Sequence, residues 1–100
     1  MYDMKNANKI AKLGELAPVA FKGFVEFDAA AFKDGALPIK YKELVAIAVA
    51  LTTQCPYCIA IHTQKAKKAG ASERELAETT LVAAAIRAGG AITHGTHTLD

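Results

Sequence analysis

Tryptophan is missing from this 100-residue chain, and proline, cysteine and methionine are scarce, at three, two and two residues. A strong net charge is also missing, because the balance is only +2 and the lysines are scattered, so nothing indicates nucleic-acid binding. The longest apolar run, residues 44–51, is too short to cross a bilayer. Residues 1–16 lack the uninterrupted apolar core of a signal peptide. We therefore expect a cytoplasmic protein that binds neither membrane nor nucleic acid.

The sequence is rich in alanine and other apolar residues, which make up 52% of it. Glycine and proline divide it into blocks with helical character, and its length suits one domain, residues 1–100. We expect an all-α bundle of five to six helices. The five main helices are predicted over residues 6–15, 19–33, 39–53, 56–69 and 73–88.

The signals that begin and end a helix are clearest for the last of these helices. Ser72 and Glu75 have the spacing of a capping box, which predicts where the helix begins. Gly89-Gly90 is predicted to break it, with residues 91–100 adding a further turn or two.

Residues 44–51 considered alone are equally compatible with a buried strand. A strand leading into Cys-Pro-Tyr-Cys would be the glutaredoxin arrangement. That fold needs further strands and a proline beside the dithiol, whereas residues 63–100 contain no proline and no convincing strand. We therefore predict a helix here and reject the glutaredoxin fold.

The only two cysteines, Cys55 and Cys58, lie three residues apart where a helix is expected to begin. Pro56 suits the first helical position, which makes Cys55 the expected N-cap. The free N–H groups and the macrodipole at a helix N-terminus favour a thiolate, the form that attacks peroxides and disulfides. In a cytoplasmic protein such a pair is typically catalytic or metal-binding.

Two further residues are predicted to join the dithiol. If residues 39–53 and 56–69 form an antiparallel hairpin that turns near residues 52–54, Glu43 and His62 come opposite one another. His62 follows Cys58 by four residues, so the two share a helical face. The imidazole is then able to accept the Cys58 proton, and Glu43 to orient the ring.

Each of these residues also has a purely structural explanation. Glu43 could be an exposed carboxylate early in a helix, His62 a packed or surface histidine, and the cysteines small buried apolar residues. The joint spacing E-x11-C-x2-C-x3-H favours a redox site, with no cofactor and no metal. The alternatives are a zinc site using Cys55, Cys58 and His62, completed by Glu43 or a tail histidine, and a non-enzymatic helical assembly module. For His94 and His97 we expect surface positions, with a weak metal site or a cap on a neighbouring subunit's pocket as alternatives.

Glu43, Cys55, Cys58 and His62 resemble the active-site signature of the AhpD-like alkylhydroperoxidases, in the carboxymuconolactone decarboxylase superfamily. The likeness covers roughly residues 15–90, including the helix order and the alanine-rich residues 81–88. It implies an all-helical fold, assembled as trimers or as hexamers built from dimers. It also implies thiol-dependent peroxide reduction or disulfide exchange with a redox partner protein.

By this resemblance Cys58 is the attacking thiol, Cys55 its resolving partner, and Glu43 and His62 a proton relay. Helix-terminus physics instead favours Cys55 as the more acidic thiol. We assign peroxide attack to Cys58, which is nearer His62, and exchange with an external reductant or partner to Cys55. The chain differs from the family in being only one domain long and in carrying Tyr57 where the best-known members have histidine. True decarboxylases of the superfamily lack the dithiol, so lactone decarboxylation is the less favoured activity.

The expected surface also points to self-association. Residues 76–86 are apolar over more of the helix circumference than one buried face requires, and residues 19–33 are rich in phenylalanine. A 100-residue monomer has too little interior to bury both. We therefore expect a homo-oligomer, with the dithiol near a subunit boundary.

Overall fold

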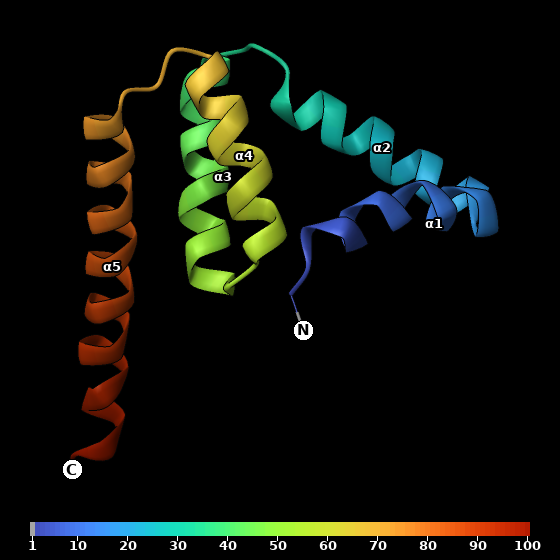
Figure 1. The fold of residues 1–100 in the computed structure, drawn as a ribbon. Helices are drawn as coiled ribbons and strands as arrows, with labels where there is room; N and C mark the ends of the chain where they lie inside the picture. Colours follow the sequence, from blue (N-terminus) through green and yellow to red (C-terminus); the bar gives the residue numbers. More distant parts are fainter. Residues whose placement is uncertain (1) are drawn as a thin grey trace.

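The computed structural model describes residues 2–100 and is all-α, as predicted (Figure 1). Within that range there are five α-helices and two short 3-10 helices, and no strand. In chain order they are η1 (Met4–Lys9), α1 (Ile10–Leu16), α2 (Pro18–Phe32), α3 (Ile39–Thr53), α4 (Pro56–Lys68), α5 (Glu73–Gly95) and η2 (Thr96–Thr98). The single helix predicted over residues 6–15 is therefore a 3-10 helix followed by an α-helix, and residues 44–51 are helical.

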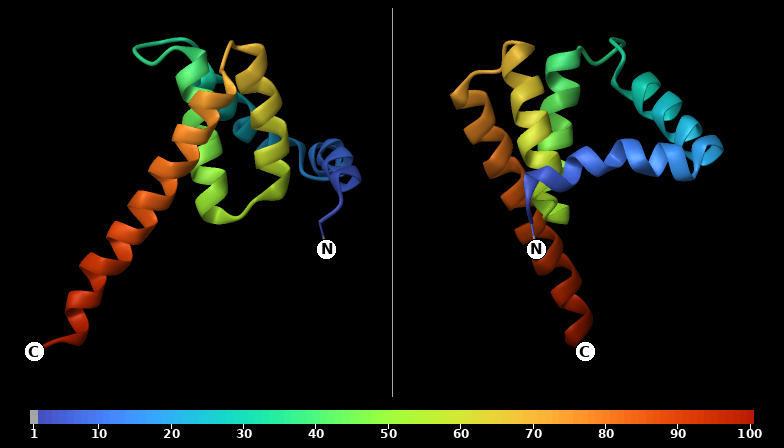
Figure 2. Two further views of the ribbon diagram at one scale, coloured as in Figure 1. Left: turned by 60° about the vertical axis from the view of Figure 1, so that its left-hand side comes forward. Right: turned by 45° about the vertical axis from the view of Figure 1, so that its right-hand side comes forward.

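The centre of the fold is the antiparallel hairpin of α3 and α4, with α5 packed against α3 (Figures 1 and 2). Gln54 ends α3 in the left-handed conformation, with φ of 58°. The N–H groups of Gln54 and Cys55 both donate to the Ala50 carbonyl, which closes the turn. The buried apolar residues are mostly small, so the helices approach closely: Ile47, Ala50, Ala66 and Ala83.

On the other side of the hairpin, α2 and α1 form a second pair (Figure 2). The end of α2 is held by Lys42 of α3, whose Nζ donates to the Ala31 carbonyl at 2.8 Å and also to the Lys33 carbonyl. Asp34 then accepts from the Ile39 N–H at 2.8 Å, at the start of α3. These bonds set the direction in which the chain returns from α2 to α3.

Helix α5 begins at the predicted capping box. The Glu75 N–H donates to Ser72 Oγ at 3.1 Å, and the Ser72 N–H donates to Glu75 Oε1 at 2.9 Å. The predicted break at Gly89-Gly90 is wrong, because α5 continues to Gly95. Neither glycine has a positive φ. Glycine costs a helix only about 1 kcal/mol relative to alanine, which weakens it without ending it when no competing cap is present.

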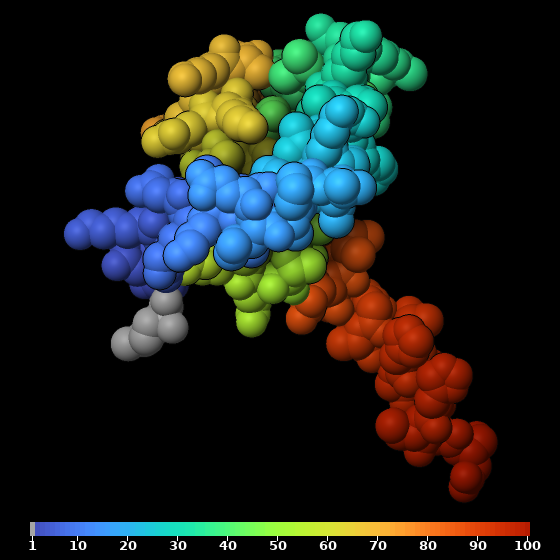
Figure 3. All heavy atoms as spheres, turned by 90° about the vertical axis from the view of Figure 1, so that its right-hand side faces the viewer, coloured from blue at the N-terminus to red at the C-terminus, as the bar shows by residue number. Residues whose placement is uncertain are grey.

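The C-terminal half of α5 extends away from the other helices as an arm (Figure 3). The radius of gyration is 16.6 Å, whereas a compact domain of this length has about 13 Å. Many large apolar side chains are exposed on α2 and α5, among them Val19, Phe27, Leu81, Ile86 and Ile92. Among the described residues, no helix combines the length and the apolar character needed to span a membrane.

Candidate functional site

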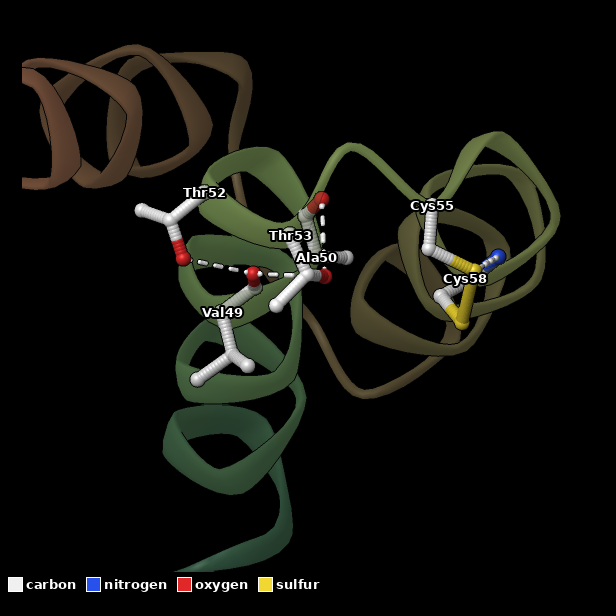
Figure 4. The surroundings of a disulfide bond; sticks show 6 residues. All are labelled: Val49, Ala50, Thr52, Thr53, Cys55 and Cys58. Atoms are coloured by element: carbon white, nitrogen blue, oxygen red, sulfur yellow. Dashed lines mark hydrogen bonds between the residues drawn. A yellow bond between two sulfur atoms is a disulfide. The ribbon is translucent and has the colours of Figure 1, made fainter.

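The two cysteines form a disulfide at the start of α4, with their Cα atoms 5.4 Å apart (Figure 4). Cys55 is the N-cap, as predicted, and its Sγ accepts a hydrogen bond of 3.3 Å from the Cys58 N–H. Pro56 occupies the first turn, where a missing N–H costs nothing. Both cysteines are half-buried. The sulfur of Cys55 thus sits at the positive end of a helix.

The end of α3 beside the disulfide is held by side-chain bonds (Figure 4). Thr52 Oγ1 donates to the Val49 carbonyl at 2.8 Å, and Thr53 Oγ1 donates to the same carbonyl at 3.1 Å. Arg87 of α5 also donates to the Thr52 carbonyl, at 2.9 Å. Of the last four carbonyls of α3, which lack helical partners, that of Ala50 accepts from the N–H groups of Gln54 and Cys55 and that of Thr52 accepts from Arg87. These bonds within the chain stabilise the turn that carries the dithiol.

Glu43 and His62 meet across the hairpin, at the register that the sequence predicts. His62 Nδ1 lies 2.6 Å from Glu43 Oε2. Glu43 is only 4% exposed, and His62 is its hydrogen-bond partner. A buried carboxylate needs such a partner. When Glu43 is ionised, Nδ1 carries the hydrogen and donates it, which leaves Nε2 free for other chemistry.

Phe32 also belongs to the site, although the sequence did not indicate it. Its ring stacks on the His62 imidazole, with centroids 5.1 Å apart and planes 10° apart. Phe32 is the last residue of α2 and lies 30 positions before His62, so neither periodicity nor a motif connects the two. No signal in the sequence alone points to this contact.

Tyr57, between the two cysteines, contacts the N-terminal segment. Its hydroxyl accepts hydrogen bonds from the Asp3 N–H at 3.4 Å and from Asn6 Nδ2 at 3.2 Å. The ring of Tyr2 packs edge-on against it, at a centroid distance of 4.8 Å. Tyr57 therefore anchors residues 2–6 beside the dithiol.

Two other polar groups lie apart from the dithiol. Lys40 of α3 and Glu75 of α5 form an ion pair of 3.0 Å. Hydrogen bonds from Ser72 and then from Lys40 lower the pKa of Glu75, and the bond to Glu75 raises the pKa of Lys40. His94 and His97 are exposed near the C-terminus, with ring centroids 5.6 Å apart. Across residues 2–100, no three His, Cys, Asp or Glu side chains are grouped so as to hold a metal ion.

Comparison with known proteins identifies a family and several relatives that are similar to this chain. The sequence model of the carboxymuconolactone decarboxylase family matches residues 18–100. Protein 4 of the cox locus of Paracoccus denitrificans is 37% identical over 102 residues, which cover 99% of this chain and 92% of that protein. The names of the curated relatives state no activity.

Two solved structures share the fold. One is the apo form of a carboxymuconolactone decarboxylase family protein from Legionella pneumophila, 40% identical with a TM-score of 0.78, covering 82% of this chain and 73% of that one. The other, from Methanobacterium thermoautotrophicum, is 34% identical with a TM-score of 0.79, covering 84% and 97%.

Proposed function

This chain belongs to the carboxymuconolactone decarboxylase family, and from that membership and the site we propose that it is a thiol-dependent peroxidase or disulfide reductase. In this proposal Cys55 and Cys58 cycle between dithiol and disulfide. The observation that supports it most is the Cys55–Cys58 disulfide at the start of a helix whose next turns carry His62, bonded to the buried Glu43.

The proposed peroxide reaction starts from the reduced dithiol. The Cys58 thiolate attacks the terminal oxygen of a hydroperoxide, the O–O bond breaks, and the alkoxide that leaves takes up a proton to become an alcohol. Cys58 is then a sulfenic acid. The Cys55 thiolate attacks its sulfur, forms the disulfide and releases hydroxide, which is protonated to water. Two thiols have supplied two electrons, and the peroxide has accepted both.

His62 and Glu43 handle the protons in this scheme. The free Nε2 of His62 accepts the Cys58 proton and returns it to the leaving alkoxide. Glu43, bonded to Nδ1, orients the ring and stabilises the imidazolium while it exists. The four-residue spacing of Cys58 and His62 along α4 supports this role, because such residues lie on one helical face.

Cys55 has a distinct role as the resolving thiol. The Cys58 N–H that donates to its sulfur at 3.3 Å would also stabilise a Cys55 thiolate, since a thiolate accepts hydrogen bonds strongly. We propose that this thiolate resolves the sulfenic acid, and that a thiol-bearing partner protein later reduces the disulfide by exchange. A cytoplasmic location would suit this cycle, because thiols there are kept reduced.

We also propose that the protein acts as a homo-oligomer, a trimer or a hexamer by family analogy. The extended shape and the exposed apolar side chains of α2 and α5 support this, because contiguous exposed apolar surface usually marks an interface. Other copies would cover the arm and border the dithiol.

Thiol titration tests the redox proposal directly. The reduced protein is treated with hydrogen peroxide or with an organic hydroperoxide, and free thiols and bound metal are measured on the same sample. We expect both thiols to be lost, with one peroxide consumed per chain and no stoichiometric metal. Stoichiometric zinc with protected thiols would support a metal site instead, and metal-free thiols that do not react would support an assembly module.

A further inference from the structure

The stack between Phe32 and His62 is not explained by the hydrophobic core. Helix α2 contains no buried residue. Of its other three phenylalanines, Phe21 is half-buried beside Gly14 of α1, whereas Phe24 and Phe27 are 57% and 71% exposed. Among the aromatic rings of the described residues, that of Phe32 stacks on the imidazole, at 5.1 Å and nearly parallel to it. The contact therefore joins α2 to the site rather than to the interior.

Helix α3 holds the backbone on both sides of Phe32, and it also binds the ring of His62, which lies on α4. Lys42 Nζ donates to the carbonyls of Ala31 and Lys33, which flank Phe32 on both sides. The next residue, Glu43, bonds to His62 Nδ1. Two successive residues of α3 thus fix both members of the stack, one through the backbone and the other through the ring.

Each contact restrains a different motion of the imidazole. The bond to Glu43 fixes one edge of the ring, but it leaves the ring able to tilt about that bond. A parallel aromatic ring against one face opposes the tilt, because an aromatic pair favours certain relative orientations of its rings. Together the two contacts restrict the directions in which Nε2 can point.

We propose that Phe32 is a positioning residue, whose stacked ring keeps His62 in the orientation in which Nδ1 stays on Glu43 and Nε2 exchanges a proton with the dithiol. The inference rests on the dithiol function proposed above for its catalytic consequence. The orientation of the ring, however, is measurable without any turnover.

The experiment uses the full chain labelled with 15N-histidine and kept reduced, and long-range 1H–15N correlation spectra report the tautomer of His62. His94 and His97 serve as internal references. Phe32→Leu removes the aromatic face and keeps an apolar side chain. Phe32→Tyr keeps the face, and Phe24→Leu makes the same change on the same helix away from His62.

We expect neutral His62 in the unmodified protein to carry its hydrogen on Nδ1. Phe32→Leu should weaken that preference, and slow oxidation of the dithiol by peroxide, by about two- to tenfold, the range that one aromatic pair supports. Phe32→Tyr should behave as the unmodified protein, and Phe24→Leu should leave the His62 signals unchanged. If Phe32→Leu does not fold, Phe32→Met takes its place.

Unchanged His62 signals in Phe32→Leu would overturn the proposal. So would an equal change in Phe24→Leu, because the effect would then belong to α2 as a whole. One outcome is that neither the unmodified protein nor any variant reacts with peroxide, while Phe32→Leu still alters the tautomer of His62. In that case the positioning role stands and the proposed peroxidase function fails. If the unmodified protein reacts and Phe32→Leu matches it in spectrum and rate, only the positioning role fails.

Discussion

The α3–α4 hairpin and helix α5 differ in which side chains have partners within the chain. In the hairpin, the buried Glu43 has a partner in the same chain, and the end of α3 is bonded by Thr52 and Thr53. In α5 only Ala83 is buried, whereas Ile86 and Ile92 are 72% and 75% exposed. The hairpin pairs its buried carboxylate within the chain, whereas α5 leaves its large apolar side chains such as Ile86 and Ile92 exposed. In the function proposed above, the hairpin carries the chemistry and α5 contacts another copy.

The length of α5 sharpens this contrast. Arg87 bonds to the end of α3, but every residue after it is exposed. The helical segment after Arg87, residues 88–95, would be marginal in water by itself because it is so short, and Gly89-Gly90 weakens it further. Packing against another copy would supply the stabilisation that the chain itself does not.

The largest expected effect comes from the dithiol. Cys58→Ser should abolish peroxide consumption, because the attacking thiol is gone. Cys55→Ser should leave a sulfenic acid on Cys58, since no second thiol resolves it. Dimedone labelling and peptide mapping measure this, and light scattering should show both variants assembled as the unmodified protein is. Dimedone adduct on Cys55 alone, in the unmodified protein, would reverse the assignment of the two cysteines.

The Glu43–His62 pair should give the next largest effect. Glu43→Gln and His62→Ala should each slow dithiol oxidation by about a hundred- to ten-thousand-fold, the usual contribution of general acid–base groups. Glu43→Gln keeps an acceptor for His62, so its thermal midpoint should change little. His62→Ala leaves a buried carboxylate without its partner, which should cost about 1–3 kcal/mol of stability. If the folded fraction of either variant keeps full activity, its residue is structural.

A charge on the arm should break assembly while leaving the site intact. Ile86→Glu places a charge at a position that the proposed oligomer covers. It should weaken association about tenfold or more, since burying a side chain of this size is worth about 1.5–3 kcal/mol. Arg74→Glu, on the exposed start of the same helix, is the matched control. Light scattering at low micromolar concentration is the measurement. A well-folded, reactive monomer of 10.6 kDa in the unmodified protein would contradict the assembly proposal.

The smallest effect concerns the ion pair that joins the two regions, Lys40–Glu75. Because the pKa of Glu75 is lowered in the folded state, its contribution to stability is present above its ordinary value of 4.5 and is lost as pH falls through the folded pKa. The raised pKa of Lys40 means that its contribution is present below 10.5 and is lost as pH rises through the folded pKa. Glu75→Gln keeps the oxygen that accepts from Ser72, so it tests the charge alone.

Thermal melts at several pH values make that comparison. The unmodified protein should melt slightly above Glu75→Gln at pH 7, and the difference should vanish in acid once Glu75 is protonated. A difference that does not depend on pH would mean that the charge of Glu75 contributes nothing and that only its packing does.

The sequence alone was enough to predict several features of local structure. Cys55 as N-cap, the capping box of Ser72 and Glu75, and the helical state of residues 44–51 are confirmed. Caps and helical periodicity depend on residues within one turn, so they are readable along the chain. The contact of Glu43 with His62 was predictable too, because a short turn leaves the hairpin little freedom of register.

Tertiary structure alone decided the contacts that depend on how separate helices meet. The stack of Phe32 on His62 depends on the angle at which α2 approaches the hairpin, which the bonds of Lys42 and Asp34 set. The continuation of α5 through Gly89-Gly90 is a different case, because its cause is local and the sequence signal was misinterpreted. A helix break requires a competing conformation that is more stable, and two glycines only weaken the helix without providing one.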